Sequence, residues 1–118
     1  LPKQYRLTQS NEFSKVYRHG KQASTSHLAV KVLKLPEQFS ENCSRFGITV
    51  SQKVSKRAVV RNRLRRQIRA ALQVLIPRMQ SGLWVVIVLR SAAVQCDYGQ
   101  FLQELEQLFS ELEVFDGY

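Results

Sequence analysis

Acidic residues are missing from the middle of this sequence. No Asp or Glu occurs between Glu41 and Asp97. The same stretch holds eleven basic residues: Arg45, Lys53, Lys56, Arg57, Arg61, Arg63, Arg65, Arg66, Arg69, Arg78 and Arg90. Because nothing inside the stretch neutralises them, we expect a polyanion to dock there. The whole chain carries a formal net charge of +9 and has a sequence pI of about 10.1, which agrees with such a partner.

Long hydrophobic runs and paired cysteines are also missing. The longest apolar stretch runs from Leu83 to Leu89, whereas a membrane-spanning helix needs about 20 residues. The start of the chain has no signal-peptide core, so we expect a cytoplasmic protein with no membrane partner. Cys43 and Cys96 are far apart and form no CxxC or Cys/His ligand spacing, so two free thiols and no metal site are expected.

The length and the hydrophobic periodicity predict one α+β domain over residues 1–118. Short helices are predicted where apolar residues recur at three and four, and strands where they alternate. Thr8 and Ser10 are the N-cap candidates of the first helix. The second strand is expected to be the hairpin partner of the first. The predicted order is helix 10–19, strand 27–35, strand 45–51, helix from 58 to about 75, strand 83–89 and a helix with the apolar stripe 101–112.

The helix that begins at Ala58 is the most distinctive segment. Its apolar residues fall on one arc, which is expected to pack on the sheet. The remaining arc carries a group that we call the arginine ridge: Arg61, Asn62, Arg63, Arg65, Arg66 and Arg69. Arginines four residues apart repel each other, and no acid within the helix offsets this. A solvated helix face normally mixes charges, so an external phosphate polyanion explains the ridge better.

Two motifs make the sequence recognisable. FGITVSQK at 46–53 is followed by RNRLRRQIR at 61–69. Together they closely resemble the motifs of bacterial ribonuclease P proteins, in which a glycine-containing strand ends in Val-Ser and leads through a short basic loop into an Arg-Asn-Arg helix. FSKVYRHG at 13–20 is similar to the aromatic first helix of that family. The resemblance covers most of the chain in order.

The resemblance implies a small α/β sandwich with a mainly antiparallel sheet of about four strands, flanking helices and a left-handed βαβ crossover. It implies a protein subunit of an endoribonuclease that removes the 5′ leader of precursor tRNA, with the chemistry carried by a catalytic RNA. Mg²⁺ would be held mainly by that RNA. The partners would be ribonuclease P RNA and the precursor tRNA leader, with no small-molecule substrate.

The resemblance also implies two RNA surfaces. One surface, which contacts the catalytic RNA, comprises Arg57 and the arginine ridge. The other is a cleft for the single-stranded leader, at Phe13, Tyr17, Lys31, Ser51 and Lys53. Aromatic stacking in a basic groove is a common way to hold single-stranded RNA. Taken alone, Phe13 and Tyr17 are better explained as core residues that anchor the first helix. The resemblance favours a cleft-lining role for at least one of them.

No catalytic residue is expected in the polypeptide. His19, His27 and Lys31 are the candidates for acid–base cleavage of RNA. However, His19 suits the end of a helix and His27 the start of a strand, and no paired carboxylates or nucleophile motif accompany them. The alternative function is that of a ribosomal or other structural RNA-binding protein without processing activity. A DNA-binding module comes third, because no helix-turn-helix pairing precedes the arginine helix.

Overall fold

The computed structural model describes residues 6–36 and 44–116. Their elements alternate along the chain in the predicted order, with one strand and two short 3-10 helices added. They are α1 (Ser10–His19), β1 (Lys21–Ser24), β2 (Leu28–Lys34), β3 (Arg45–Thr49), α2 (Ala58–Leu75), η3 (Ile76–Arg78), β4 (Leu83–Leu89), η4 (Ser91–Gln95) and α3 (Tyr98–Glu111).

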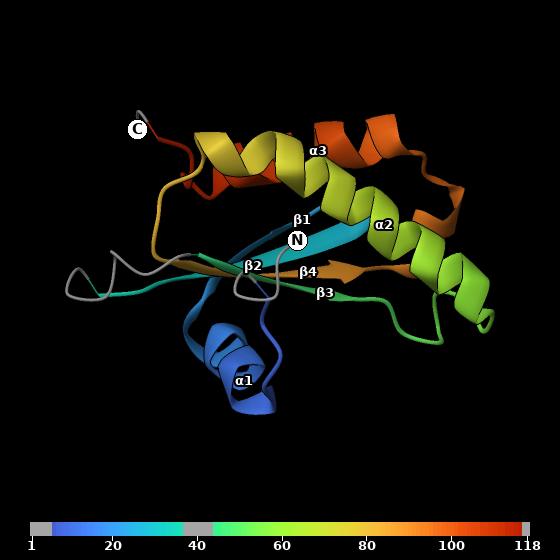
Figure 1. Ribbon diagram of the computed structural model, residues 1–118, viewed down its shortest axis with the longest axis horizontal. Coiled ribbons are helices and arrows are strands. Elements are labelled where there is room, and N and C mark those ends of the chain that lie inside the picture. The colour runs from blue at the N-terminus through green and yellow to red at the C-terminus, as the bar shows by residue number, and fades with distance from the viewer. Residues whose placement is uncertain (1–5, 37–43, 117–118) are drawn as a thin grey trace.

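One four-stranded mixed sheet organises these elements, with strand order β1-β2-β4-β3. The pairs β1–β2 and β2–β4 are antiparallel, and β3–β4 is parallel. The predicted hairpin between 27–35 and 45–51 is therefore wrong, because β4 lies between those two strands. Connecting the parallel strands β3 and β4 requires a crossover, which is α2. In Figure 1, α2 lies above the sheet with β3 in front of β4, the left-handed arrangement that the resemblance implies.

Two helices cover one face of the sheet and the third covers part of the other. Figure 1 shows α2 and α3 side by side above the strands and α1 below them. The main core lies under α2 and α3, with Leu64, Ile68, Phe101 and Phe109 completely buried. A smaller cluster of Leu7, Val16 and Val86 lies under α1. No helix in the described part of the chain is long and apolar enough to cross a membrane.

The middle strands show why the pattern predicted the layers correctly. In β2, Leu28, Val30 and Val32 are buried in the main core, while Ala29 and Lys31 between them are half-buried. In β4, Val86 is also buried, on the face that α1 covers. A strand with helices on both faces needs apolar residues at consecutive positions, and the run 83–89 provides them.

The structure departs from the predicted elements in two further places. The strand β1 was not predicted, because its sequence Lys-Gln-Ala-Ser is mostly polar and exposed, as is usual at a sheet edge. The N-cap of α1 is Gln9, not Thr8 or Ser10. The Glu12 carboxylate accepts a hydrogen bond from the Gln9 backbone N–H at 3.2 Å, which satisfies a donor at the start of the helix. The end of α2 at Leu75, just before Pro77, is confirmed.

Candidate nucleic-acid interface

Helix α1 places Phe13 and Tyr17 on one side of the helix, one turn apart. Val16 between them is completely buried against Leu7 and Val86 and so fixes the rotation of α1 on the sheet. The register puts Lys31, Val86 and Gly47 side by side across β2, β4 and β3. Phe13 lies over the Gly47 end of this row and Tyr17 over the Lys31 end. The two aromatic side chains therefore border one line across the sheet.

Phe13 is half-buried and lies against the backbone of β3. A Cβ atom added to Gly47 would come within 2.6 Å of the Phe13 Cε1 atom and 3.3 Å of the Leu7 Cβ atom. The ring thus occupies the space that any other residue at position 47 would fill. The glycine of the first motif is explained by this close approach of a ring to the strand.

Tyr17 is not a core residue, since 45% of its surface is exposed. The Lys31 Nζ atom lies 4.4 Å from the centroid of the Tyr17 ring, within cation–π distance. Lys31 thereby contacts the ring from the side of the sheet, while part of the ring stays exposed to solvent. An aromatic surface beside a positive charge can stack on a base and attract a phosphate.

The next row of the sheet forms the floor beyond α1. Ala29, Val88 and Thr49 lie side by side in register and are half-buried; we call them the open strip. Figure 1 shows α1 under only one end of the lower face, with no described helix under the end where β3 and β4 finish. The exposed residues Ser51 and Lys53 follow directly after β3 at that end. Phe13, Tyr17 and Lys31 thus lie on one face of the sheet, and Ser51 and Lys53 lie in the exposed loop after β3.

The arginine ridge lies in the first two thirds of α2. Asn62, Arg63 and Arg66 are exposed, as is Arg57, the residue that precedes the helix. Three ridge residues, Arg61, Asn62 and Arg65, also make hydrogen bonds within the protein. The Arg61 Nη1 atom donates to the Ser55 carbonyl oxygen at 2.9 Å, and the Arg65 Nη1 atom donates to the Asn62 Oδ1 atom at 3.1 Å. Arg61 therefore helps to hold the loop between β3 and α2, in addition to contributing charge.

Arg65 and Arg69 lie on the side of the ridge that is nearest to the edge strand β3. A hollow of about 120 Å³ contains both, together with Phe13, Gly47 and Arg6. Partial burial lowers the pKa of Arg69, and the charges of Arg6 and Arg65 lower it further. Three guanidinium groups near one hollow favour a bound anion such as a phosphate.

This hollow connects the two predicted surfaces, since Phe13 belongs to one and Arg65 and Arg69 to the other. Arg6 is a candidate residue that sequence analysis missed. Its only sequence signal is its charge. Its position follows from the bridge that it forms with Phe46 at the edge of the sheet.

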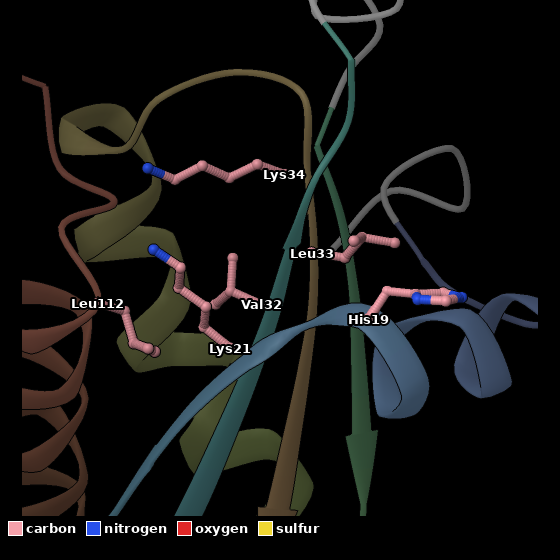
Figure 2. A pocket seen from close by; sticks show the side chains of 6 residues that line it. All are labelled: His19, Lys21, Val32, Leu33, Lys34 and Leu112. Carbon is pink, nitrogen blue, oxygen red and sulfur yellow. The ribbon is translucent and has the colours of Figure 1, made fainter.

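A second hollow, of about 190 Å³, lies away from these residues. It is lined by His19, Lys21, Val32, Leu33, Lys34 and Leu112. In Figure 2, the Lys21 and Lys34 side chains point to the face of the sheet that α2 and α3 cover, and His19 lies on the face that α1 covers. None of these residues belongs to either predicted surface. The two lysines are therefore suitable positions for control substitutions.

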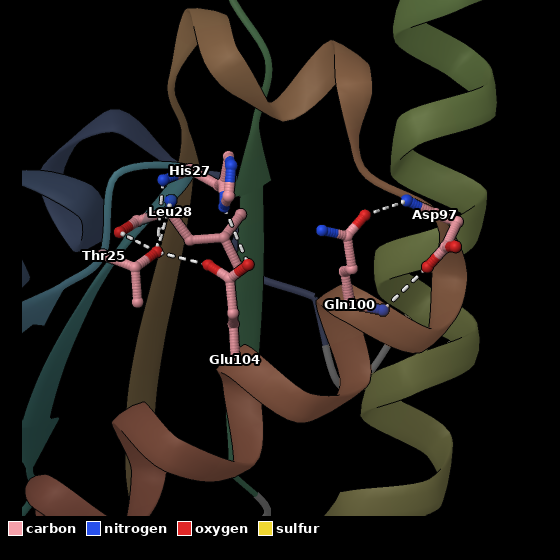
Figure 3. A network of polar contacts seen from close by, with 6 residues as sticks. All are labelled: Thr25, His27, Leu28, Asp97, Gln100 and Glu104. Atoms are coloured by element: carbon pink, nitrogen blue, oxygen red, sulfur yellow. Dashed lines mark hydrogen bonds and ion pairs between the residues drawn. The ribbon is translucent and has the colours of Figure 1, made fainter.

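His27 is held in a polar network at the β1–β2 edge of the sheet, away from the β3 edge where Arg65 and Arg69 lie. Its Nδ1 atom lies 2.8 Å from the Glu104 Oε2 atom, and Thr25 Oγ1 donates to the other oxygen of Glu104 (Figure 3). His19 lies on α1, outside this network. Cys96 is buried, and burial together with Glu104 and Asp97 raises the pKa of its thiol. Cys43 lies outside the described residues.

The fold and the surface define a class: a small basic α+β protein with arginines exposed along one helix. The comparisons with known proteins then identify the family. A family model described as Ribonuclease P matches residues 1–113. A protein from Cyanothece sp. named ribonuclease P protein component is 48% identical over 130 residues, covering 100% of this chain and 99% of the relative. A protein of the same name from Synechocystis sp. is 47% identical, covering 98% and 91%.

Solved structures agree with the sequence relatives. The RNase P protein of Staphylococcus aureus has a TM-score of 0.82 at 24% identity, covering 95% of this chain and 98% of that one. The RNase P protein of Thermotoga maritima has a TM-score of 0.75 at 23% identity, covering 86% and 94%. At these identities the structures support the fold. This chain belongs to the ribonuclease P protein family.

Proposed function

We propose that this chain is the protein subunit of ribonuclease P, and that it assists a catalytic RNA in the endonucleolytic removal of the 5′ leader from precursor tRNA. The match to the family model over 1–113 and the names of the curated relatives support this role. They do not support a structural RNA-binding protein without processing activity. We also propose that residues 1–118 form one ribonuclease P protein domain, working in the cytoplasm.

The arginine ridge and Arg57 are proposed to bind the RNA subunit. Asn62, Arg63 and Arg66 are exposed along one helix, and α2 contains no acidic residue to compete for them. Arginine forms bidentate contacts with phosphate, which suits a folded RNA backbone. Phosphate contacts of this kind provide affinity and orientation.

The leader is proposed to lie along the open strip, bordered by Phe13, Tyr17 and Lys31 and continuing past Ser51 and Lys53. The observation that carries this proposal is the exposed Tyr17 ring held over Lys31 next to a strip of sheet that α1 leaves uncovered. A single strand presents unstacked bases that can stack on an exposed ring such as Tyr17, whereas the bases of a duplex are already paired and stacked.

The chemistry is assigned to the RNA subunit and its Mg²⁺. A bound Mg²⁺ would activate water and stabilise the charge that develops on the phosphate. Mg²⁺ prefers oxygen ligands, and the two proposed RNA surfaces contain basic, aromatic and hydroxyl groups and one amide, with no carboxylate. RNA phosphates are therefore the expected ligands. The role of the chain is to bind, to orient the leader and to reduce repulsion between RNA strands.

Reconstitution tests the proposed role. The purified chain is added to a bacterial ribonuclease P RNA at low Mg²⁺, and leader removal from a precursor tRNA is timed. We expect faster and accurate cleavage, lost when Arg63, Arg65 and Arg66 are all changed to Ala. Arg61 is left unchanged because it also anchors Ser55. The matched control changes Lys21, Lys34 and Arg78, which removes the same charge elsewhere. RNA binding without faster cleavage would overturn the role.

The cleft has a separate test. Changing Phe13 and Tyr17 to Leu is expected to weaken binding of precursor tRNA to the holoenzyme by about tenfold or more, because stacking contributes about 1–3 kcal/mol per base. Binding of mature tRNA, which has no leader, is expected to stay the same. Equal losses for the two RNAs would exclude a leader contact at these residues.

A further inference from the structure

Three potential metal ligands meet at the β1–β2 edge of the sheet. The His27 Nδ1 atom, the Cys96 Sγ atom and a carboxylate oxygen of Glu104 all lie within 4.8 Å of one another. They come from the turn after β1, the residue that follows η4 and the second turn of α3. None of them belongs to the arginine ridge or to the proposed cleft.

We propose that His27, Cys96 and Glu104 form a zinc-binding site with a fourth position open to water or an external ligand. Zn²⁺ accepts imidazole nitrogen, thiolate sulfur and carboxylate oxygen in tetrahedral geometry, whereas Mg²⁺ and Ca²⁺ require oxygen ligands. The mixture of donors therefore selects zinc. This site departs from the expectation of no metal, which was based on spacing along the chain.

The distances are compatible with the ion after small side-chain movements. Zinc bonds of about 2.0–2.3 Å in a tetrahedron separate the ligand atoms by about 3.3–3.8 Å. The His27 Nδ1 atom and the Glu104 Oε2 atom are now 2.8 Å apart and would separate slightly. Since all the ligand atoms lie within 4.8 Å of one another, the sulfur would have to approach by about 1 Å at most. Binding to the metal requires a lone pair on the His27 Nδ1 atom, so the proton of the neutral ring would reside on Nε2, and the Cys96 thiol would release its proton.

The surroundings orient two of the ligands. Thr25 Oγ1 donates to Glu104 Oε1, which leaves Oε2 directed at His27 (Figure 3). Cys96 directly precedes the capping box of α3, in which the Asp97 side chain accepts from the Gln100 backbone N–H at 2.8 Å. Such outer contacts pre-orient ligands and strengthen metal binding.

Burial and charge favour a cation here. Cys96 is buried, and the side chains of His27 and Glu104 are 26% and 15% exposed. Glu104 and Asp97 provide negative charge, and the other acidic side chains described on α3 are Glu106 and Glu111. A partly exposed histidine leaves a path for the ion to enter.

Metal titration of the full chain tests the site, beginning with the chain treated with a chelator. Co²⁺, as a spectroscopic substitute, is expected to bind at one equivalent and to give a thiolate-to-cobalt charge-transfer band. The band should disappear in Cys96→Ser and persist in Cys43→Ser. At a concentration about 100 times its Kd, Zn²⁺ should raise Tm by about 10 °C. Variants His27→Ala and Glu104→Gln should lose this rise.

Matched controls remove the same residue types elsewhere. His19→Ala and Glu106→Gln are expected to keep both the charge-transfer band and the rise in Tm. The absence of a charge-transfer band would overturn the site, as would a band that depends on Cys43 or a rise in Tm that His27→Ala and Glu104→Gln retain. These readouts need no RNA, so their failure would leave the proposed ribonuclease P role untouched.

Discussion

Gly47 shows how one missing side chain shapes the candidate interface. Because position 47 has no Cβ atom, the Phe13 ring can lie against β3, and Val16 can reach the buried cluster beside it. The glycine was visible in the sequence as part of a motif. Its reason, a phenylalanine 34 residues earlier in the chain, was not, because contacts between distant residues leave no local pattern.

Replacing Gly47 with Ala is therefore expected to push the Phe13 ring away and to lower the free energy of unfolding by about 1–3 kcal/mol, as overpacking does. The measurement is urea unfolding of the single variants and the double variant. In Phe13→Ala/Gly47→Ala the clash is gone, so the two effects should couple by more than about 0.5 kcal/mol. Simple additivity would contradict the packing argument.

Glu12 is a second residue whose surroundings determine how much it contributes to the free energy of unfolding. Its carboxylate is 8% exposed, pairs with Arg45 of β3 and accepts from the Gln9 backbone N–H. Changing Glu12 to Ala should lower the free energy of unfolding by about 2 kcal/mol, because it leaves Arg45 and a helix-end donor without this partner. Glu106, which pairs with Arg78 with both side chains about half exposed, is the control. Glu106→Ala should cost less than about 0.5 kcal/mol. Equal losses in thermal or urea unfolding would contradict this.

At the scale of elements, α2 begins poorly for a helix. Arg57 is its N-cap and provides no side-chain hydrogen bond, and no acidic residue lies in the first turn. Serine or aspartate there would stabilise the helix, and positive charge at a helix N-terminus is unfavourable. An arginine at the N-cap is explained if Arg57 serves RNA binding and not the stability of α2.

The variant Arg57→Ser is accordingly expected to be more stable than the original chain by about 0.5–1 kcal/mol and to bind ribonuclease P RNA more weakly. Urea unfolding and filter binding measure the two effects. Lys56→Ser is the matched control, since it removes one positive charge beside the N-cap but does not place a serine at the N-cap position. Its stability should stay within about 0.5 kcal/mol. A loss of stability in Arg57→Ser would show that Arg57 has a structural role.

The elements themselves were predicted with different success. The bounds 10–19 and 83–89 agree with the structure, because helix and strand periods are local properties of the chain. The pairing of β3 was predicted wrongly, since neighbouring strands in sequence usually form hairpins. Here the long helix α2 has to return to the sheet, and β4 is inserted between β2 and β3.

At the scale of the whole molecule, the two helices on one face carry opposite charges. The arginine-rich α2 packs toward β3, and the acidic α3 packs toward β1 and β2. The two helices lie side by side in one layer above the sheet (Figure 1). The separation of charge thus runs from one edge of the sheet to the other.

This separation predicts that the position of a charge matters more than the total charge. RNA affinity should fall steeply with salt, and Arg63→Gln and Arg66→Gln should each reduce the log–log slope by about 0.7–0.9. Arg78→Gln removes the same charge beside Glu106 and should leave the slope unchanged. Binding isotherms over a series of salt concentrations measure this. Equal changes at all three arginines would mean that net charge alone attracts the RNA.

The sequence by itself determined the polyanion partner, the helix and strand periods and the family resemblance, because charge, periodicity and motifs are properties of consecutive residues. Only the tertiary structure decided what lies between β2 and β3, where Arg6 sits, which ridge arginines also hold the protein together, and that His27, Cys96 and Glu104 meet. These depend on residues far apart in the chain, and they are brought together by burial of the core and by hydrogen bonding of the sheet, which no local pattern encodes.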